Sequence, residues 1–196
     1  MGRLSMSDEV LRKTCAFDVC YRCELGCCQD VKPPLTLKRK KIIEDYLREQ
    51  KIRVENPFTD KAYSYPTVDA MGFCLFYDKD TRRCLVHPVK PETCRAGPVT
   101  FDINRRTRKV EWHLKTAEVC ELAKILRGND DLFRAHLKVA KEEILRLICE
   151  LDSEALQAIL KIEELQTVKI GEDDLPEEVM EKLGISTRII SETIKE

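Results

Sequence analysis

Apolar residues recur with helical spacing in residues 37–47, and five of them fall near one face: Leu37, Ile42, Ile43, Tyr46 and Leu47. Thr36 stands immediately before this stretch, where its hydroxyl can cap the first turn. The helix should end before Asn56-Pro57, because the residue that precedes a proline disfavours the helical conformation. The basic residues 38–41 are then predicted to form a solvated face of this helix.

Helical periodicity also dominates the C-terminal third of the chain. Residues 131–148 predict a long helix, and Asp152 or Ser153 can cap a further helix. Cys149 follows in an apolar run and is predicted to pack in the core. His136 is expected at the surface or at the rim of the core.

A shorter helix is predicted over residues 117–127, with Thr116 as its N-cap and Gly128 after its end. This prediction places Cys120 in the first helical turn. The helix dipole there lowers the pKa of a thiol and favours the thiolate that a metal needs. Further on, Pro176 favours the first turn of a small terminal helix.

Alternation of apolar and polar residues predicts strands at residues 99–103 and 109–114, joined as a hairpin by a basic loop. A short strand is expected at residues 167–170. Residues 63–77 are rich in aromatic and β-branched residues but contain a proline and a glycine, so short irregular strands are predicted there. Helices and antiparallel strands that occupy separate stretches indicate an α+β fold.

The composition changes the picture chiefly by what it excludes. The 196 residues are 43% hydrophobic and 35% charged with a net charge of −1, so the chain can bury a core without disulfides. This charge balance gives no reason to expect a nucleic-acid or membrane partner. No apolar stretch approaches the roughly 18 residues of a membrane span, and the N-terminus lacks a signal-peptide core. We therefore expect a cytoplasmic protein whose ten cysteines are not paired in disulfides.

Four cysteines are concentrated in one short segment, Cys20-x2-Cys23-x3-Cys27-Cys28. Thiols this close in sequence usually bind a metal or exchange disulfides. Three more follow at even spacing, Cys74-x9-Cys84-x9-Cys94. Residues 78–81 resemble a turn between two short strands, which would bring Cys74 and Cys84 together across a hairpin.

The cysteine pattern continues into a second motif, Cys84-x2-His87-x2-Lys90-Pro91-x2-Cys94-Arg95. Together the two motifs resemble the YkgJ-type cysteine-cluster family, a zinc- or iron-chelating domain that is also found in flagellin lysine N-methylases. The resemblance covers about residues 17–120. In two places the chain departs from the family pattern. Three residues, where the family usually has two, separate Cys23 from the pair Cys27-Cys28, and His87 stands where tyrosine is common. His87 is therefore a possible additional ligand.

Cys15 and Cys149 can be explained as small hydrophobic residues packed in the core. The other eight cysteines are the predicted metal ligands: Cys20, Cys23, Cys27, Cys28, Cys74, Cys84, Cys94 and Cys120. Whether Cys15 ligates stays open. Zinc sites usually show two Cys-x-x-Cys pairs, and this chain has one. Scattered single cysteines favour an iron–sulfur cluster, which we expect to be 4Fe–4S, with Zn²⁺ as the alternative. Adjacent cysteines in an extended segment would point to opposite faces, so Cys27 and Cys28 are not expected to ligate the same ion.

These observations predict two units. Residues 14–128 form an irregular metal-bound cysteine-cluster domain with short strands and flanking helices, and residues 129–196 form a mainly helical C-terminal extension packed on it. The predicted function is metal binding with a redox or protein-modification role. One alternative is a structural zinc module that recruits a protein partner, and another is an enzyme that resembles a flagellin lysine N-methylase. The sequence has no glycine-rich phosphate loop and no Cys-x3-Cys-x2-Cys motif, so catalysis stays open.

Overall fold

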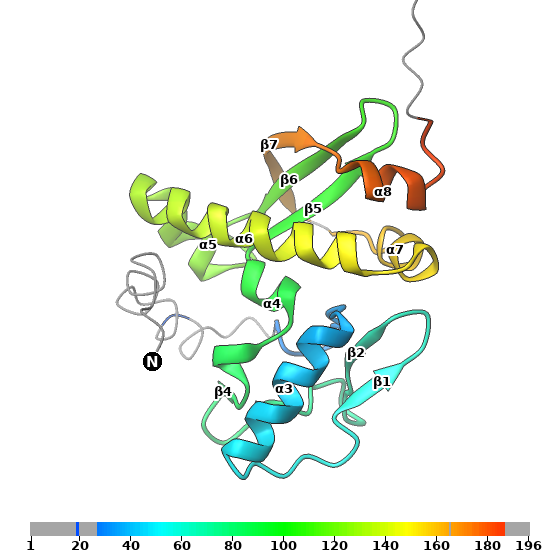
Figure 1. Cartoon of the computed structure of the whole chain (residues 1–196). Coiled ribbons are helices and arrows are strands. Elements are labelled where there is room, and N and C mark those ends of the chain that lie inside the picture. The colour runs from blue at the N-terminus through cyan, green and yellow to red at the C-terminus, as the bar shows by residue number, and fades with distance from the viewer. Residues whose placement is uncertain (1–18, 20–26, 165, 187–196) are drawn as a thin grey trace, which may run out of the picture.

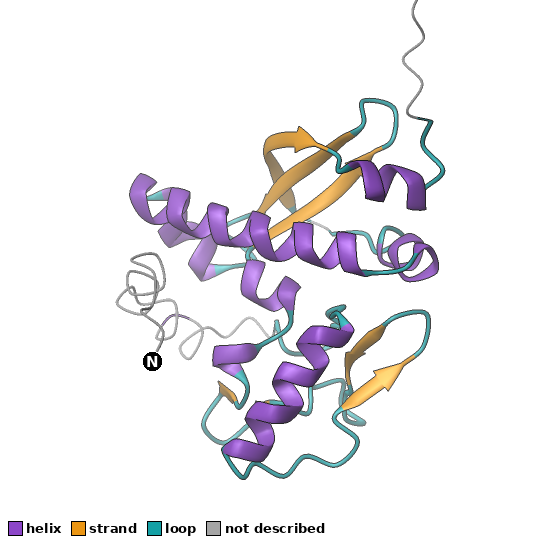
Figure 2. Cartoon of the chain, in the orientation of Figure 1, coloured by secondary structure: helices purple, strands orange, loops and turns teal. Residues whose placement is uncertain are grey.

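The computed structural model describes Val19, residues 27–164 and residues 166–186. It confirms a mixture of helices with short antiparallel strands, which is an α+β fold (Figures 1 and 2). In chain order the elements are α3 (Leu37–Glu49), β1 (Phe58–Asp60), β2 (Ser64–Pro66), β3 (Tyr77–Asp78), β4 (Arg83–Cys84), the 3₁₀ turn η1 (His87–Val89), α4 (Glu92–Ala96), β5 (Val99–Asn104), β6 (Lys109–Lys115), α5 (Glu121–Arg127), α6 (Asp130–Glu150), α7 (Ser153–Ile159), β7 (Thr167–Asp174) and α8 (Glu177–Lys182).

The larger part of the structure is built on the antiparallel sheet β5-β6-β7, with the long helix α6 packed across one face (Figure 1). The predicted hairpin is confirmed, with Phe101 opposite Trp112. The third strand is longer than the predicted residues 167–170, because its pairing with β6 continues past an irregularity at Trp112/His113 as far as Asp174. Residues from alternate positions of the sheet and from one face of α6 form the main core, as their periodicities require.

The smaller part holds α3 and two short hairpins, β1–β2 and β3–β4, with longer loops between these units (Figure 2). Thr36 caps α3 as predicted, since its hydroxyl oxygen accepts a hydrogen bond from the backbone N–H of Arg39 at 3.1 Å. A second, smaller core lies under this helix and contains the buried residues Ile43, Leu47, Phe76 and Val86. The short helix α4 lies between the two parts and packs against α6 (Figure 1).

Two predicted features of the helices are wrong. The helix predicted from residue 117 begins at Glu121, because the carbonyl of Thr116 accepts hydrogen bonds from the N–H groups of Val119 and Cys120 and closes a turn there. Cys120 is therefore the N-cap residue of α5 and does not lie in its first turn. His136 is buried and lies 3.0 Å from the carbonyl oxygen of Ala96, so it is not a surface histidine.

The basic run 38–41 is also not uniformly solvated. Arg39 is buried with 6% of its surface exposed, and it pairs with two carboxylates described below. Its position explains this burial, since Arg39, Ile43 and Leu47 are spaced by four residues and share one face of α3.

Among the described residues, none of the helices combines the length and the apolar character that a membrane span requires. The division at residues 128/129 stays a prediction, although β7 and β6 join the two sequence ranges in one sheet.

Candidate metal centre

Five of the predicted cysteine ligands line one cavity of about 1940 Å³: Cys27, Cys28, Cys74, Cys84 and Cys94. They come from four segments of the chain, namely the turn at Cys27 and Cys28, the loop before β3, the end of β4, and α4. None of them forms a disulfide with another described cysteine. The fold thus gathers thiols that lie up to 67 residues apart, from Cys27 to Cys94, around one space.

Backbone hydrogen bonds hold the first two segments together. The N–H of Cys74 donates to the carbonyl of Cys28 at 2.9 Å, and Gln29 forms an isolated bridge with Phe73. The predicted hairpin of β3 and β4 is present, but Cys84 is opposite Tyr77. Cys74 lies before the strand, where it forms an isolated bridge with Val68 and its carbonyl accepts a hydrogen bond from the N–H of Tyr77. The hairpin therefore brings Cys84 near Cys74 without pairing the two residues.

Cys27 and Cys28 form a hydrogen-bonded thiol pair. The bond from Cys28 lowers the pKa of Cys27 to about 6, and the cations Lys90 and Lys115 act in the same direction against the effect of burial. The same bond, together with burial and neighbouring thiolates, raises the pKa of Cys28. The pair therefore holds one proton at neutral pH. The two residues lie in a turn with their thiols hydrogen-bonded to each other, so the expected extended backbone with the side chains on opposite faces is wrong. That they do not ligate the same ion stays a prediction.

The other three thiols that line the cavity are protonated in the absence of metal. Burial raises the pKa of Cys74 to about 11, and burial also raises the pKa values of Cys84 and Cys94. Neighbouring thiolates add to this effect, whereas Lys90 opposes it at Cys84 and at Cys94. A metal that binds here must displace these protons, so binding strengthens as the pH rises.

Lys90 acts on three of the thiols, because it lowers the pKa values of Cys27, Cys84 and Cys94, whereas Lys115 acts on Cys27. Arg95, the residue that follows Cys94 in the second motif, has different partners. Its guanidinium pairs with Glu143 at 2.9 Å and donates to the carbonyl of Pro88 at 3.3 Å. Arg95 therefore holds the backbone beside Cys94 in place, and the positive charge that stabilises the Cys94 thiolate comes from Lys90.

His87 also lines the cavity, on η1. Burial lowers its pKa to about 3, with further contributions from Lys90 and Arg95. The imidazole is therefore neutral at physiological pH, which is the form that binds a metal. Its role as an additional ligand stays a prediction.

Comparison with protein families identifies the domain. A family model for CxxCxxCC, described as "Putative zinc- or iron-chelating domain", matches residues 19–121. The chain belongs to this family. The resemblance predicted from the two cysteine motifs is thereby confirmed, and the family supports metal binding in general by this protein. No curated protein and no solved structure matches the chain significantly.

The matched range contains all eight predicted ligands, with Cys120 near its end. Cys20 and Cys23 lie outside the described residues, as does Cys15. Cys120 does not line the cavity formed by the described residues. Cys149 packs against the main core, away from the cavity, and burial raises its pKa to about 12.

The donor set of the CxxCxxCC domain fits a thiophilic metal. Five thiols, one of them ionised at neutral pH, share a cavity with a lysine ammonium and a neutral imidazole. Within the described ranges, no three His, Cys, Asp or Glu side chains lie close enough together to hold a single metal ion. The full set of eight ligands therefore stays a prediction.

Sequence reasoning missed the charged residues that surround α4. Glu92 and Glu143 are both buried and both pair with Arg39. A signal for Arg39 was present in its spacing from Ile43 and Leu47 on α3. A comparable signal marks Glu143, because it shares the buried face of α6 with Ala140 and Leu147, whereas adjacent Glu142 is exposed.

Proposed function

We propose that this protein holds an iron–sulfur cluster through cysteine thiolates of its CxxCxxCC domain and serves a redox role. The observation that carries the proposal is that five cysteines from four chain segments are among the residues that line one cavity. Cys74, Cys84 and Cys94 provide scattered thiols, and Cys27 and Cys28 provide a pair. Cys20 and Cys23 belong to the same short motif and would complete the set.

The spacing of the thiols favours a cluster over a single zinc ion. A zinc site needs four ligand atoms at about 2.0–2.3 Å from one centre, and thiolates scattered over single positions supply this less readily than two Cys-x-x-Cys pairs do. A 4Fe–4S cluster presents its iron atoms at separate corners, so its ligands can approach from several directions. Four chain segments that surround one cavity suit the second arrangement.

The protein's own residues would tune such a cluster. Thiolate ligands make the site negatively charged, and the ammonium of Lys90 lies where it acts on three of the thiols. Burial around Cys74, Cys84 and Cys94 limits access of water to the ligands. When bound, the cluster would supply one-electron transfer.

Anaerobic purification followed by metal analysis and visible spectroscopy tests the proposal. A brown protein that contains iron and acid-labile sulfide, and whose broad visible absorption bleaches with dithionite, is the expected result. Colourless protein with stoichiometric zinc, after expression with ample iron, would contradict it. That outcome would favour the structural zinc module instead, since Zn²⁺ has neither colour nor redox chemistry.

A further inference from the structure

The five-residue helix α4 carries Cys94 and is fixed to α3 at its N-terminal end. The Oε1 atom of Glu92 accepts a hydrogen bond from the hydroxyl of Thr36 at 2.9 Å and lies 3.5 Å from Nε of Arg39. Glu92 is fully buried and Thr36 and Arg39 are nearly so. These contacts hold the start of α4 against the first turn of α3.

The C-terminal end of α4 is fixed to α6. The guanidinium of Arg95 lies 2.9 Å from Oε1 of Glu143, and Nε2 of His136 lies 3.0 Å from the carbonyl oxygen of Ala96. A helix of five residues has too few internal hydrogen bonds to hold its own conformation. Its orientation is therefore set by these neighbours.

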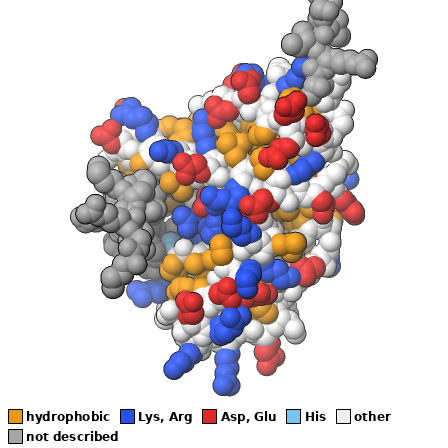
Figure 3. All heavy atoms as spheres, in the orientation of Figure 1, with side chains coloured by type: hydrophobic (Ala, Val, Ile, Leu, Met, Phe, Trp, Pro, Cys, Tyr) orange, Lys and Arg blue, Asp and Glu red, His pale blue; other side chains and the backbone are white. Residues whose placement is uncertain are grey.

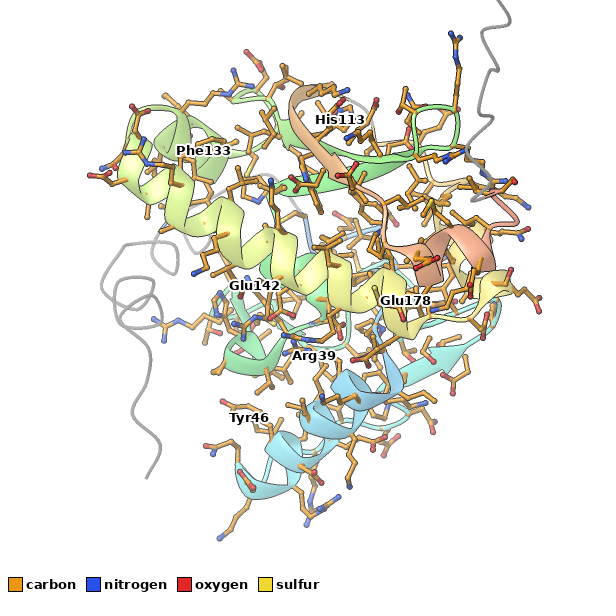
Figure 4. The ribbon with its side chains drawn as sticks, turned by 45° about the horizontal axis from the view of Figure 1, so that its top comes forward. Arg39, Tyr46, His113, Phe133, Glu142 and Glu178 are labelled. Carbon is orange, nitrogen blue, oxygen red and sulfur yellow. The ribbon has the colours of Figure 1, made fainter. Side chains whose placement is uncertain are left out.

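Glu143 is the centre of the contacts on the α6 side. One of its oxygens lies 2.6 Å from Arg39 and 3.1 Å from Arg146, and the other binds Arg95. The carboxylate is 5% exposed, and it thus joins α3, α4 and α6 at a single buried point. Figure 4 shows Arg39 between α3 and α6, and Figure 3 shows Lys and Arg side chains gathered at the centre of the face where α4 and α6 lie.

We propose that Glu143 is a positioning residue for the metal centre: through Arg95 and Arg39 it fixes α4 and thereby the direction in which Cys94 faces the cavity. This inference rests on the proposed binding of a metal by Cys94. A ligand that is held in place before the metal arrives binds it more tightly than one that must first be ordered. Glu143 itself touches no thiol, so its effect on the metal is transmitted through α4.

Glu143→Gln tests the inference, and Glu142→Gln is its matched control. Glu142 is the preceding residue of α6, is exposed and forms no ion pair among the described residues. Each anaerobically purified protein is titrated with EDTA to measure how readily it gives up the metal that it carries, and the unfolding midpoint of the metal-free form is measured separately. We expect Glu143→Gln to weaken metal retention by about tenfold or more. Glu142→Gln should behave as the wild type does.

A second pair of variants covers the case in which Glu143→Gln does not fold. Arg95 is partly exposed, so Arg95→Gln removes its contacts with Glu143 and with the carbonyl of Pro88 while Arg39 and Arg146 still pair with Glu143. Arg95→Lys keeps the charge. Arg95→Gln should weaken metal retention by about tenfold, and Arg95→Lys should restore part of it. A purely structural role would lower the midpoint of the metal-free form without this loss of metal.

The two proposals fail in different ways. A wild-type protein that carries no metal overturns the proposed function and this inference together. A metal-loaded wild type whose retention equals that of both Glu143→Gln and Arg95→Gln overturns the inference alone. Loss of stability in these variants without weaker metal retention also overturns it.

Discussion

The indole N–H of Trp112 donates a hydrogen bond to Oδ2 of Asp173 at 2.7 Å, which joins the central strand β6 to the edge strand β7. Trp112 is fully buried, and the same carboxylate pairs with Lys141 of α6. One aspartate therefore connects the sheet to the helix that covers it. A polar atom on a buried tryptophan needs such a partner.

Asp173→Ala should lower the free energy of unfolding by about 1–3 kcal/mol, because it leaves the indole N–H without its partner. The measurement is urea denaturation of the metal-free protein. Asp174→Ala is the control, since the Asp174 side chain is 91% exposed and pairs with Lys109 at the surface. Its cost should stay below about 1 kcal/mol, and equal costs for the two variants would contradict the assigned role of Asp173.

Substitution of the thiols should separate ligands from core cysteines. Cys94→Ala removes a thiol that lines the cavity, so we expect the purified protein to lose most of its metal. Cys149→Ala should keep full metal content, because that thiol packs against the main core. Metal analysis decides the matter, and an equal loss of metal in the two variants would reject the ligand assignment.

The stability of the fold should decrease as the pH falls below about 6.5. Burial lowers the pKa of His136 in the folded state, with a further contribution from Lys90, although the bond to Ala96 opposes the shift. The unfolded chain therefore takes up the proton first. The contribution of His136 to the free energy of unfolding is fully present above the pKa that this histidine has in the unfolded chain. It is lost as the pH falls below that value, by up to about 1.4 kcal/mol per pH unit.

The dependence of the unfolding free energy on pH is measured by denaturing wild type and His136→Gln at three pH values. These are about 7.5, 6.5 and 5.5, the ordinary histidine pKa and one unit to each side of it. His87 also has a lowered pKa and contributes in the same direction, so the difference between the two proteins isolates His136. The variant should lose less stability on acidification. Identical slopes would show that His136 does not contribute.

Lys90→Gln should raise the pKa of Cys27 from about 6 toward its ordinary value, because the ammonium stabilises the thiolate. In metal-free protein, the rate at which Cys27 is alkylated near pH 6 should therefore fall, with mass spectrometry of the peptide locating the label. Lys90→Arg should retain the fast rate. Lys38→Gln, at an exposed position of α3, serves as a control and should leave the rate unchanged.

The helices and strands that follow from a local pattern of apolar and polar residues could be predicted from the sequence. Thr36 and the apolar positions after it predicted α3, and strict alternation predicted the hairpin of β5 and β6. These signals are carried by neighbouring residues and their periodicity. The gathering of Cys74, Cys84 and Cys94 followed from their motif and its family, not from periodicity.

The ion pair of Arg39 with Glu143 could not be derived in the same way. Its partner Glu143 lies 104 residues away, and only the packing of α3 against α6 brings the two together. The turn that joins the thiols of Cys27 and Cys28 was likewise missed, because adjacent residues were assumed to lie in extended backbone. The first case depends on a tertiary contact that a local window does not contain, and the second on a wrong assumption about the local backbone.

The unequal size of the two cores has a consequence for how the protein opens. Among the residues that the structure describes, the main core buries 21 hydrophobic residues, whereas the core beneath α3 buries four. Cys74 and Cys84 border the smaller one, so a bound metal would cross-link the part of the chain that has least packing of its own. Without the metal, the amides of β3 and β4 should exchange with solvent quickly while those of β5 and β6 stay protected. A protease would then cut first in the loops between α3 and α4, and the persistence of those loops under digestion would report how much of the protein is loaded.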